Sequence, residues 1–306
     1  MKVFVTGGTG AIGRPAVMAL VAAGFGVTAL ARSPRKAEEV TGLGAVAVEV
    51  SIFDRAGLGE AMAGHDAVVN LATAIPPMSR FMRTGAWAEN DRIRTEGSAA
   101  VVDAALDAGV GRVVQESVCM LYRDGGAGWV DENMPTDAYP MARGNLAAEA
   151  SSQRFSEAGG TGIVLRFGWF YGPGAAHSEQ LLALARRHVC AQIGPAGGYV
   201  SSIHVDDGGA AVAAVLQAAA GIYNVVDDEP LTKRAYAEAL GEAGGKRPWL
   251  RVPGRAGLLL GDRSTSLTRS LRVSNAKLRR ETGWAPQYPS AREGLSATAR
   301  ALSDRR

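Results

Sequence analysis

The stretch "VFVTGGTGAIGRP", from Val3 to Pro15, decides the fold class of this chain. A short apolar run is followed by Gly7, Gly10 and Gly13, and then by an uncharged, alanine-rich segment typical of a buried helix. The first glycine permits a tight turn, the second lets the backbone approach a pyrophosphate, and the third lets helix and strand pack closely. The helix N-terminus offers N–H groups and partial positive charge to a phosphate. The stretch therefore predicts a strand, a dinucleotide-binding turn and a helix.

The rest of the chain alternates short apolar runs with longer helical patterns. The runs are continuous in Val, Ala and Leu, which indicates strands buried on both faces of a parallel sheet with helices on both sides. The expected strands span residues 2–7, 26–32, 45–50, 66–72, 112–117, 162–168 and 221–226. The expected helices span residues 14–24, 34–40, 55–63, 93–109 and 204–219. The fold class is therefore α/β, with a doubly wound parallel sheet.

Two segments break this rhythm. Residues 169–200 and 227–306 are richer in Gly, Pro and Arg and less regular than the rest. We expect them to form a smaller C-terminal substrate-binding lobe over the carboxyl edge of the sheet, whereas residues 1–168 and 201–226 form the NAD(P)-binding domain. A chain of 306 residues is long enough for two closely packed units of this kind.

The composition, with 47% hydrophobic and 21% charged residues, is ordinary for a globular protein. Cys119 and Cys190 lie far apart, and the four histidines form no ligand pattern, so neither a disulfide framework nor a metal site is expected. A reducing cytoplasm fits this cysteine usage. The uncharged stretch from Pro15 to Ala31 has 17 residues, whereas a membrane-spanning helix needs roughly 20. Because the chain opens directly on a strand, no signal peptide is expected.

The net charge of +3 is unevenly distributed, because the segment from Lys246 to Arg306 holds 14 Lys or Arg against 4 Asp or Glu. Such a basic region attracts an anionic substrate or a phosphate; a solvated surface is the alternative explanation. The cations are dispersed among Gly, Pro and Leu and follow no nucleic-acid-binding motif. We therefore expect a small-molecule substrate as ligand, and neither nucleic acid nor a membrane as partner.

The end of the second expected strand bears on the choice of cofactor. An Asp or Glu about 20 residues after the glycines would bind a ribose 2′-hydroxyl. The chain instead reads "TALARSPRK", with Arg32 at that place and Arg35 and Lys36 directly after it. Because cationic groups suit a 2′-phosphate, the sequence favours NADP over NAD as cofactor. The alternative is that these are plain surface charges.

Several motifs in the same order make the chain resemble the extended short-chain dehydrogenase/reductase superfamily, in its NAD(P)-dependent epimerase/dehydratase branch. "TGGTGAIG" is similar to the family's TGxxGxxG turn, "SIFDRAGL" to its adenine-contacting segment, and "VVNLAT" to the fourth strand beside the nicotinamide. "LRFGWFYGPG", "IHVDD", "YNVVDDEP" and "TGWAPQYPSAREGL" resemble later family segments. The resemblance covers nearly the whole chain. It implies a Rossmann domain, a small C-terminal substrate lobe and, in many members, a homodimer.

The resemblance, together with the cations after the second strand, defines a set of expected cofactor contacts. Within "SIFDRAGL", Asp54 matches the second Asp of the family's D-x-x-D pattern, and Ser51 stands in place of the first. The expected cofactor-binding residues are Thr6, Gly7, Gly10, Ala11, Ile12, Gly13, Arg32, Asp54, Leu71, Ala72, Thr73 and Asn145.

The family's catalytic set is altered in this chain. The family uses a Ser or Thr after the fifth strand and Tyr-x-x-x-Lys on the next helix, where the Tyr exchanges a proton and the Lys lowers its pKa. Here the strand continues as "VVQESVCMLY". Matching Tyr122 to the family's Tyr in this segment places Val118 at the Ser position, with Ser117 one residue earlier.

The helix that follows offers two registers. The first takes Tyr139 and Arg143 from "YPMAR", which keeps a phenol and a cation four residues apart. The second matches "MARGNLAAE" to the family's Y-G-x-S-K-L-A-A-E and places Met141 at the Tyr and Asn145 at the Lys. The second register matches more positions. Pro140 also suits the start of a helix, which puts Tyr139 in the loop ahead of it.

Neither register restores the usual chemistry. Arginine is a bulkier, planar cation and no conservative exchange for lysine. A thioether transfers no proton, and an amide cannot lower a phenol pKa by its charge. One hypothesis is an oxidoreductase or epimerase with displaced groups, in which Tyr139 or Tyr122 donates the proton and Ser117 orients a carbonyl.

Two further hypotheses remain open. A redox-neutral isomerase or lyase on the same scaffold would use other acids, such as Glu116, Asp131 or Glu132. A nucleotide-binding sensor or partner protein would do no chemistry. In the substrate lobe, His177 either faces the ligand or is an ordinary surface residue, and His204 in "IHVDD" is expected to brace the lobe junction.

Overall fold

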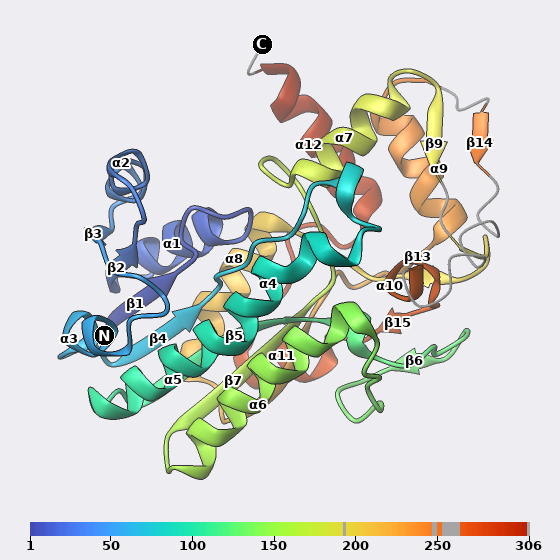
Figure 1. Ribbon diagram of the computed structural model, residues 1–306. Helices are drawn as coiled ribbons and strands as arrows, with labels where there is room; N and C mark the ends of the chain where they lie inside the picture. Colours follow the sequence, from blue (N-terminus) through green and yellow to red (C-terminus); the bar gives the residue numbers. More distant parts are fainter. Residues whose placement is uncertain (192–193, 247–249, 253–263, 305–306) are drawn as a thin grey trace.

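The fold is built on one parallel β-sheet, as the sequence predicts (Figure 1). The computed structural model describes residues 1–191, 194–246, 250–252 and 264–304. Within them, seven strands pair in the order β12-β7-β5-β4-β1-β2-β3, and every pair is parallel. The strands are β1 (Lys2–Thr6), β2 (Gly26–Leu30), β3 (Val46–Val48), β4 (Ala67–Asn70), β5 (Arg112–Val118), β7 (Thr161–Phe167) and β12 (Gly221–Val225).

Helices cover both faces of this sheet (Figure 1). Successive side chains of β1 point to opposite faces of the sheet, so both faces need a covering layer. Val3 and Val5 pack with α1 (Gly13–Ala22) and α8 (Val205–Ala214) on one face. Phe4 packs with the layer of helices on the other face. That layer consists of α3 (Arg55–Met62), α5 (Ser98–Asp107) and α6 (Arg143–Glu157). Helix α2 (Pro34–Gly42) links β2 to β3. The strand order reverses between β1 and β4, which is where open α/β sheets bind their ligands.

The helix before β5 is longer than its apolar pattern predicts. It begins as η2 (Thr84–Trp87) and α4 (Ala88–Arg92), passes through a π-helical turn, η3 (Ile93–Gly97), and continues as α5. Asn90, Arg94 and Ser98 are buried along its inner side at steps of four residues. Single π turns inside α-helices are rare, and those that occur are frequently found at functional sites.

The smaller lobe is held together by short strand pairs that the sequence does not predict. The pairs are β8 (Trp169–Tyr171) with β11 (Ser202–His204), β9 (Val189–Ala191) with β14 (Leu250–Val252), β10 (Tyr199–Val200) with β13 (Leu231–Thr232), and β6 (Trp129–Val130) with β15 (Arg272–Val273). Its helices are α7 (Ala176–Ala185), α9 (Lys233–Ala243), α10 (Thr265–Thr268) and α12 (Ala291–Asp304), whereas α11 (Ala276–Thr282) packs against β12 and places Leu278 in the core of the main sheet. Short 3₁₀ turns are η1 (Met78–Arg80), η4 (Cys119–Leu121), η5 (Pro140–Ala142) and η6 (Val215–Gln217).

The C-terminal segment is fastened to the Rossmann domain through Asp207 on α8. Its carboxylate accepts the backbone N–H groups of Gln287, at 2.7 Å, and Tyr288, at 3.1 Å, and its carbonyl accepts the indole N–H of Trp284 at 3.1 Å. Part of the basic region that the sequence emphasises, residues 247–249, 253–263 and 305–306, lies outside the described residues. Within the described part of the chain, no helix has both the length and the apolar character needed to cross a membrane.

Candidate cofactor and substrate site

The glycine turn is a cradle that side chains would fill. Gly7 adopts φ +69°, and a Cβ there would lie 2.4 Å from the carbonyl oxygen of Leu71. A Cβ on Gly13 would lie 2.0 Å from the carbonyl oxygen of Gly7. At the start of α1, Arg14 N–H donates to the Gly10 carbonyl at 3.2 Å, and Pro15 has no N–H. Among the described residues, no backbone acceptor is found for the N–H groups of residues 11–13, which are therefore the donors that fit the pyrophosphate of a dinucleotide.

A buried polar network fixes the strand ends beneath this turn. The Thr6 hydroxyl donates to the side-chain oxygen of Asn70 at 2.5 Å, and the Asn70 amide donates to Gln115 at 2.8 Å and Ser98 at 3.2 Å. These bonds tie β1, β4 and β5 to the long helix. The side chain of Thr6 is thus engaged inside the protein, although the sequence predicts it as a cofactor contact.

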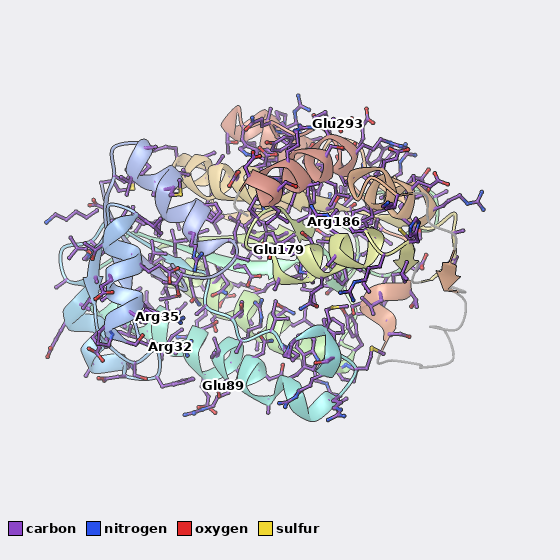
Figure 2. The ribbon with its side chains drawn as sticks, turned by 90° about the horizontal axis from the view of Figure 1, so that it is seen from above. Arg32, Arg35, Glu89, Glu179, Arg186 and Glu293 are labelled. Carbon is purple, nitrogen blue, oxygen red and sulfur yellow. The ribbon has the colours of Figure 1, made fainter. Side chains whose placement is uncertain are left out.

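Cations gather beside the turn at the end of β2. Lys36 Nζ donates to the Thr9 hydroxyl at 3.0 Å. Burial lowers the pKa of Lys36, repulsion from Arg32, Arg35 and Arg14 lowers the pKa further, and attraction to the carboxylate of Glu39 opposes the shift. Figure 2 labels Arg32 and Arg35 next to one another beside the blue N-terminal part of the ribbon. Glu39 forms an ion pair with Arg14, and the cations around Lys36 outnumber this carboxylate, so the cluster would accept an anion.

The remaining predicted cofactor residues lie around the same strand ends. Asp54 is an exposed N-cap whose carboxylate accepts the N–H of Gly57 at 3.1 Å. Ile12 and Leu71 have buried side chains, so that only their backbone is available at the turn. Ala11 and Thr73 line the cavity described next.

A cavity of about 430 Å³ runs from the turn into the lobe. Ala11 and Thr73 border it on the cofactor side, and Trp169, Phe170 and His177 border it on the lobe side. Most of its wall is apolar: Ile75, Pro76, Pro77, Met78, Phe81, Trp87, Val118, Met120, Trp169 and Phe170. Its described polar members are Thr73, Asn90, Arg94, Glu116, Tyr139, Asn145, His177, Gln180 and Ser266. The cavity thus has a mostly apolar wall next to the glycine turn, which would suit a mostly apolar ligand.

A buried ion pair forms part of the cavity wall. Arg94 Nη2 lies 2.5 Å from Glu116 Oε2, and Arg94 Nη1 donates to the Glu116 carbonyl at 3.2 Å. Both side chains are almost fully buried. Burial raises the pKa of Glu116, and the charge and hydrogen bond of Arg94 oppose that shift. Arg94 thereby holds the carboxyl of Glu116 against the end of β5.

Tyr139 lines the cavity and lies just ahead of η5, as the sequence predicts. Its hydroxyl donates to the Met120 carbonyl at 3.1 Å, and the guanidinium of Arg269 lies 5.0 Å from its ring centre. Burial raises the pKa of Tyr139, so the phenol stays protonated. Arg143, its partner in the first register, is exposed and does not border the cavity among the described residues.

The second register places Asn145 in the cavity wall, nearly fully buried on α6. The backbone of Met141 lies in η5, but its side chain lies outside what the structure describes. No lysine occurs among the described residues that border the cavity.

The other predicted catalytic side chains lie away from the cavity lining. The Ser117 hydroxyl donates to Glu149 at 2.6 Å, and the Tyr122 hydroxyl donates to Asn224 at 2.7 Å. Both residues are fully buried. The structure therefore does not bring Ser117 and Tyr122 together with Tyr139 around one ligand, and their hydroxyls have internal partners.

The acids of the redox-neutral hypothesis are also dispersed. Glu116 borders the cavity, whereas Glu132 accepts the N–H of Asn224 at 2.9 Å and Asp131 accepts that of Asn133 at 3.0 Å in an exposed turn. His204 lies between the rings of Tyr171 and Tyr288, at 5.4 and 4.4 Å, where the lobe meets α8.

Sequence reasoning missed the contribution of the helix before β5. Asn90 and Arg94 both line the cavity, and the Asn90 side chain accepts the N–H of Ala74 at 3.2 Å, which holds the loop after β4. The available signal was spacing: residues 90, 94 and 98 continue the buried helical stripe with polar side chains.

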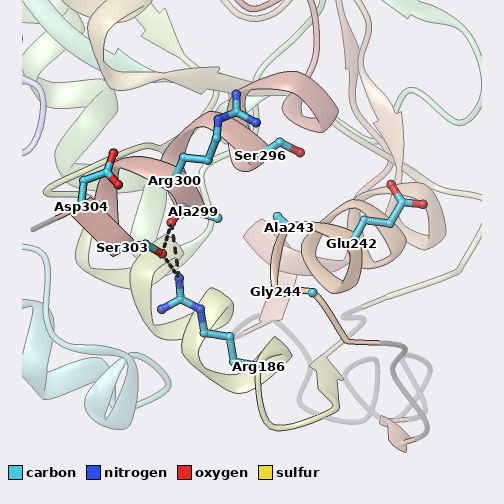
Figure 3. A pocket seen from close by; sticks show the side chains of 10 residues that line it. Arg186, Glu242, Ala243, Gly244, Ser296, Ala299, Arg300, Ser303 and Asp304 are labelled. Atoms are coloured by element: carbon cyan, nitrogen blue, oxygen red, sulfur yellow. Dashed lines mark hydrogen bonds between the residues drawn. The ribbon is translucent and has the colours of Figure 1, made fainter. Parts of the chain in front are cut away.

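A second hollow, of about 510 Å³, lies between α7, α9 and α12 in the lobe (Figure 3). It is open, and Arg186 beside it donates to the Ala299 carbonyl at 3.4 Å and the Ser303 hydroxyl at 3.5 Å. None of the residues predicted from the sequence as cofactor or catalytic residues borders it among the described residues. Nor do the described residues contain a group of three or more His, Cys, Asp or Glu placed to hold a metal ion.

Comparisons with known proteins agree with this geometry. The family model described as NAD(P)H-binding matches residues 7–180. A 3-diazoavenalumate denitrifying reductase from a Streptomyces species is 35% identical over 96% of this chain and 99% of the relative. A 4-hydroxy-2-methyl-3-oxo-4-farnesyl-3,4-dihydroquinoline-1-oxide ketoreductase from Stigmatella aurantiaca is 28% identical over 98% and 96%.

Solved structures share the fold along the whole chain. A human epimerase family protein with NADPH superposes with a TM-score of 0.82 at 24% identity, covering 98% of this chain and 99% of that one. A dTDP-glucose 4,6-dehydratase from Streptomyces venezuelae with NAD superposes with a TM-score of 0.81 at 24% identity, covering 99% and 97%.

Proposed function

Because the chain belongs to the NAD(P)H-binding family of extended short-chain dehydrogenases/reductases, we propose that it is an NADPH-dependent reductase of electrophilic, conjugated small molecules. The observation that carries the proposal is a continuous cavity that joins Ala11 and Thr73 at the glycine turn to an apolar wall in the lobe. The glycine turn would hold a reduced nicotinamide cofactor, which would supply a hydride, and the apolar wall would exclude water from an aromatic or polyene substrate.

The preference for NADPH rests on the cations beside the turn. The pKa of Lys36 is lowered first by burial and then by repulsion from Arg32 and Arg35, and a 2′-phosphate beside these cations would relieve the repulsion. No carboxylate stands at the end of β2 to accept a ribose 2′-hydroxyl, because residues 30–32 read Leu, Ala and Arg.

The altered catalytic helix favours an acceptor that needs no proton from the protein. Reducing a ketone requires a hydride at carbon and a proton at oxygen, which the family's Tyr and Lys provide. An aryl diazonium group requires the hydride alone. The hydride adds to the terminal nitrogen to give an aryl diazene, which loses N₂ while its hydrogen passes to the ring carbon. The name of the 35% identical relative, a denitrifying reductase of a diazo compound, agrees with this second chemistry.

The proposal is tested by supplying an aryl diazonium salt with NADPH carrying deuterium on one face of nicotinamide C4. We expect one N₂ released per NADPH oxidised, and loss of deuterium from C4 of the product NADP⁺ with only one of the two labelled cofactors, since enzymatic transfer uses one face. Equal loss of label from both faces would indicate reduction in free solution. Tight binding of NADPH without oxidation by any diazonium or carbonyl compound would favour the non-catalytic sensor instead.

Ketone reduction is the second candidate, favoured by Tyr139, whose phenol lies in the cavity wall. To donate a proton, Tyr139 must give up its bond to the Met120 carbonyl. A Met141→Tyr/Asn145→Lys variant restores the family's pair in the second register. If the second register holds, this variant should raise the reduction of an aromatic ketone by about a hundredfold, the usual contribution of a placed general acid. An unchanged rate would contradict that register.

A further inference from the structure

The ion pair in the cavity wall occupies only one of the two carboxylate oxygens of Glu116. Oε2 accepts a hydrogen bond from Arg94 Nη2 at 2.5 Å, and Arg94 Nη1 donates to the Glu116 carbonyl at 3.2 Å. The side chain of Gln115 donates to the same carbonyl at 2.9 Å. The carboxylate is therefore held from one side, and its second oxygen, Oε1, has no hydrogen-bond partner among the described residues.

Oε1 of Glu116 is reachable by water, in contrast to the unpartnered oxygens of the interior. Among the described residues, side-chain oxygens that lack both a partner and access to solvent include one of Asp91 and one of Asp227, but neither oxygen of Glu116. Since Oε1 has no partner and does not belong to this sealed group, a water molecule can touch it. Glu116 is only 2% exposed as a whole and borders the cavity, so this access comes from the cavity.

The ion pair determines which kind of partner Oε1 needs. Burial raises the pKa of Glu116, but the charge of Arg94 and its hydrogen bond to Oε2 favour the ionised carboxylate. An ionised carboxylate accepts hydrogen bonds and donates none. Hydrogen bonds to a charged acceptor are stronger than those between neutral groups, and the mostly apolar wall of this cavity strengthens them further. A ligand in the cavity therefore gains most if it brings a donor to Oε1.

The acceptor lies at the catalytic end of the cavity. Glu116 and Val118 are two residues apart on β5 and so point to the same face of the sheet, and both border the cavity. Val118 stands where the family has its catalytic Ser or Thr, and Asn145 of the second register borders the same cavity. A donor bonded to Oε1 would therefore belong to the part of the ligand that enters this end.

We infer that Glu116 is a specificity-determining residue whose Oε1 accepts a hydrogen bond from a hydroxyl group on the aromatic or conjugated substrate. The inference rests on the proposed reductase function for the class of substrate. Arg94 is a positioning residue, because it orients the carboxylate and compensates its charge, so that a neutral hydroxyl is sufficient as partner. A site built to bond a hydroxyl discriminates strongly against an analogue without one, because its buried polar atom is left unpaired.

The test uses equilibrium binding of 2-naphthol and 2-fluoronaphthalene to the full chain saturated with NADP⁺ at neutral pH, followed by the fluorescence of the probes. The two probes share an aromatic body, and fluorine is close to a hydroxyl in size but donates no hydrogen bond. The measured quantity is the preference, defined as the Kd of 2-fluoronaphthalene divided by the Kd of 2-naphthol. We expect this preference to depend on the carboxylate of Glu116.

Arg94→Met/Glu116→Leu replaces the ion pair with apolar side chains of similar volume, an exchange that buried pairs often tolerate. It removes the acceptor, so the preference should fall about tenfold through weaker binding of 2-naphthol. The matched control is Arg92→Met/Glu96→Leu, which removes an exposed ion pair of the same long helix and should leave the preference unchanged. Glu116→Gln keeps the shape of the side chain and can bond Arg94 through its amide oxygen. It then turns an N–H donor toward the cavity and should also lower the preference, so the test does not depend on the folding of the paired variant.

Three results would overturn the inference: an unchanged preference in Arg94→Met/Glu116→Leu or in Glu116→Gln, equal weakening of both probes in either variant, or an equal fall in the control. Because the readout is binding and not turnover, it is independent of whether the chain reduces diazonium compounds. Failure of the proposed function would appear as an absence of NADPH oxidation with the Glu116-dependent preference still present. Failure of the inference would leave NADPH oxidation intact and the preference insensitive to Glu116.

Discussion

The two ends of the cavity are built by opposite means. At the cofactor end the binding surface is formed by the backbone, because a side chain at Gly7 or Gly13 would collide with neighbouring backbone atoms. At the catalytic end the reactive groups must be side chains, and in the second register Val118 and Asn145 occupy the positions of the family's reactive residues. The frame that carries them, β5 and α6, is nevertheless in place. From this difference we expect nucleotide binding and proton transfer to be separable in this chain, so that a change at one end of the cavity leaves the geometry of the other end intact.

The largest effect should come from breaking the ion pair that replaces ordinary packing at the catalytic end. Arg94→Met leaves Glu116 buried without its cation and should lower the free energy of unfolding by about 3–5 kcal/mol, measured by chemical denaturation. The control is Arg92→Met on the same helix, whose partner Glu96 is exposed. That variant should lose about 1 kcal/mol or less, including its contact with the Phe53 ring. Equal losses in the two variants would contradict a special role for the buried pair.

A single added methyl group in the glycine turn should prevent nucleotide binding at the cofactor end. Gly7→Ala forces a Cβ against the Leu71 carbonyl and should cost about 1–3 kcal/mol of stability while abolishing measurable NADPH binding. Gly109 has the same φ of +69° but open space around its Cβ position. Gly109→Ala therefore isolates the backbone strain and should leave the Kd for NADPH unchanged. Retained binding in Gly7→Ala would show that the turn does not hold the nucleotide.

A smaller effect is expected on the preference of the cofactor end for NADPH over NADH. Arg32→Ser removes one cation of the cluster and should raise the Kd for NADPH about tenfold while leaving the Kd for NADH unchanged. Arg55→Ser, on α3 and paired with Asp107, serves as the control for a change in net charge. A parallel change for both cofactors would mean that Arg32 does not contact the 2′-position.

The smallest effect is expected where the usual chemistry would predict the largest. Tyr139→Phe should cost about 1 kcal/mol of stability through the lost bond to Met120 and should leave kcat with a diazonium substrate unchanged. Tyr122→Phe loses a comparable bond to Asn224 and provides the matched control. A tenfold or greater fall in kcat confined to Tyr139→Phe would identify Tyr139 as the proton donor. The acid/base residue would then have moved to a different position in the sequence and would not have been lost.

The sequence predicted the parts of the molecule whose signal is local. The glycine turn and the parallel sheet follow from spacing and continuous apolar runs, and the start of α6 near Pro140 follows from the fixed φ of proline. The four lobe strand pairs are two or three residues long and join segments far apart in the chain, too short for a periodic pattern. Side-chain direction near the end of β5 was likewise not readable, so Ser117 and Tyr122 could not be distinguished from cavity residues such as Glu116.

Arg94 illustrates a different limit. A cation in a helix is usually solvated, and only its partner 22 positions later explains why this one is buried. Neither residue alone signals the cavity. The available hint in the sequence was the four-residue spacing of the polar residues 90, 94 and 98, and it becomes decisive only when the structure shows that all three are buried.

The ion pair between Arg94 and Glu116 also has an evolutionary consequence. Replacing either residue alone leaves a buried charge without its partner, whereas replacing both with apolar residues of similar volume is often tolerated. The two positions should therefore change together as lineages diverge, with few single-step intermediates between the paired states. Covariation of positions 94 and 116 among homologous sequences would show which lineages retained the ion pair in the cavity wall and which replaced both residues.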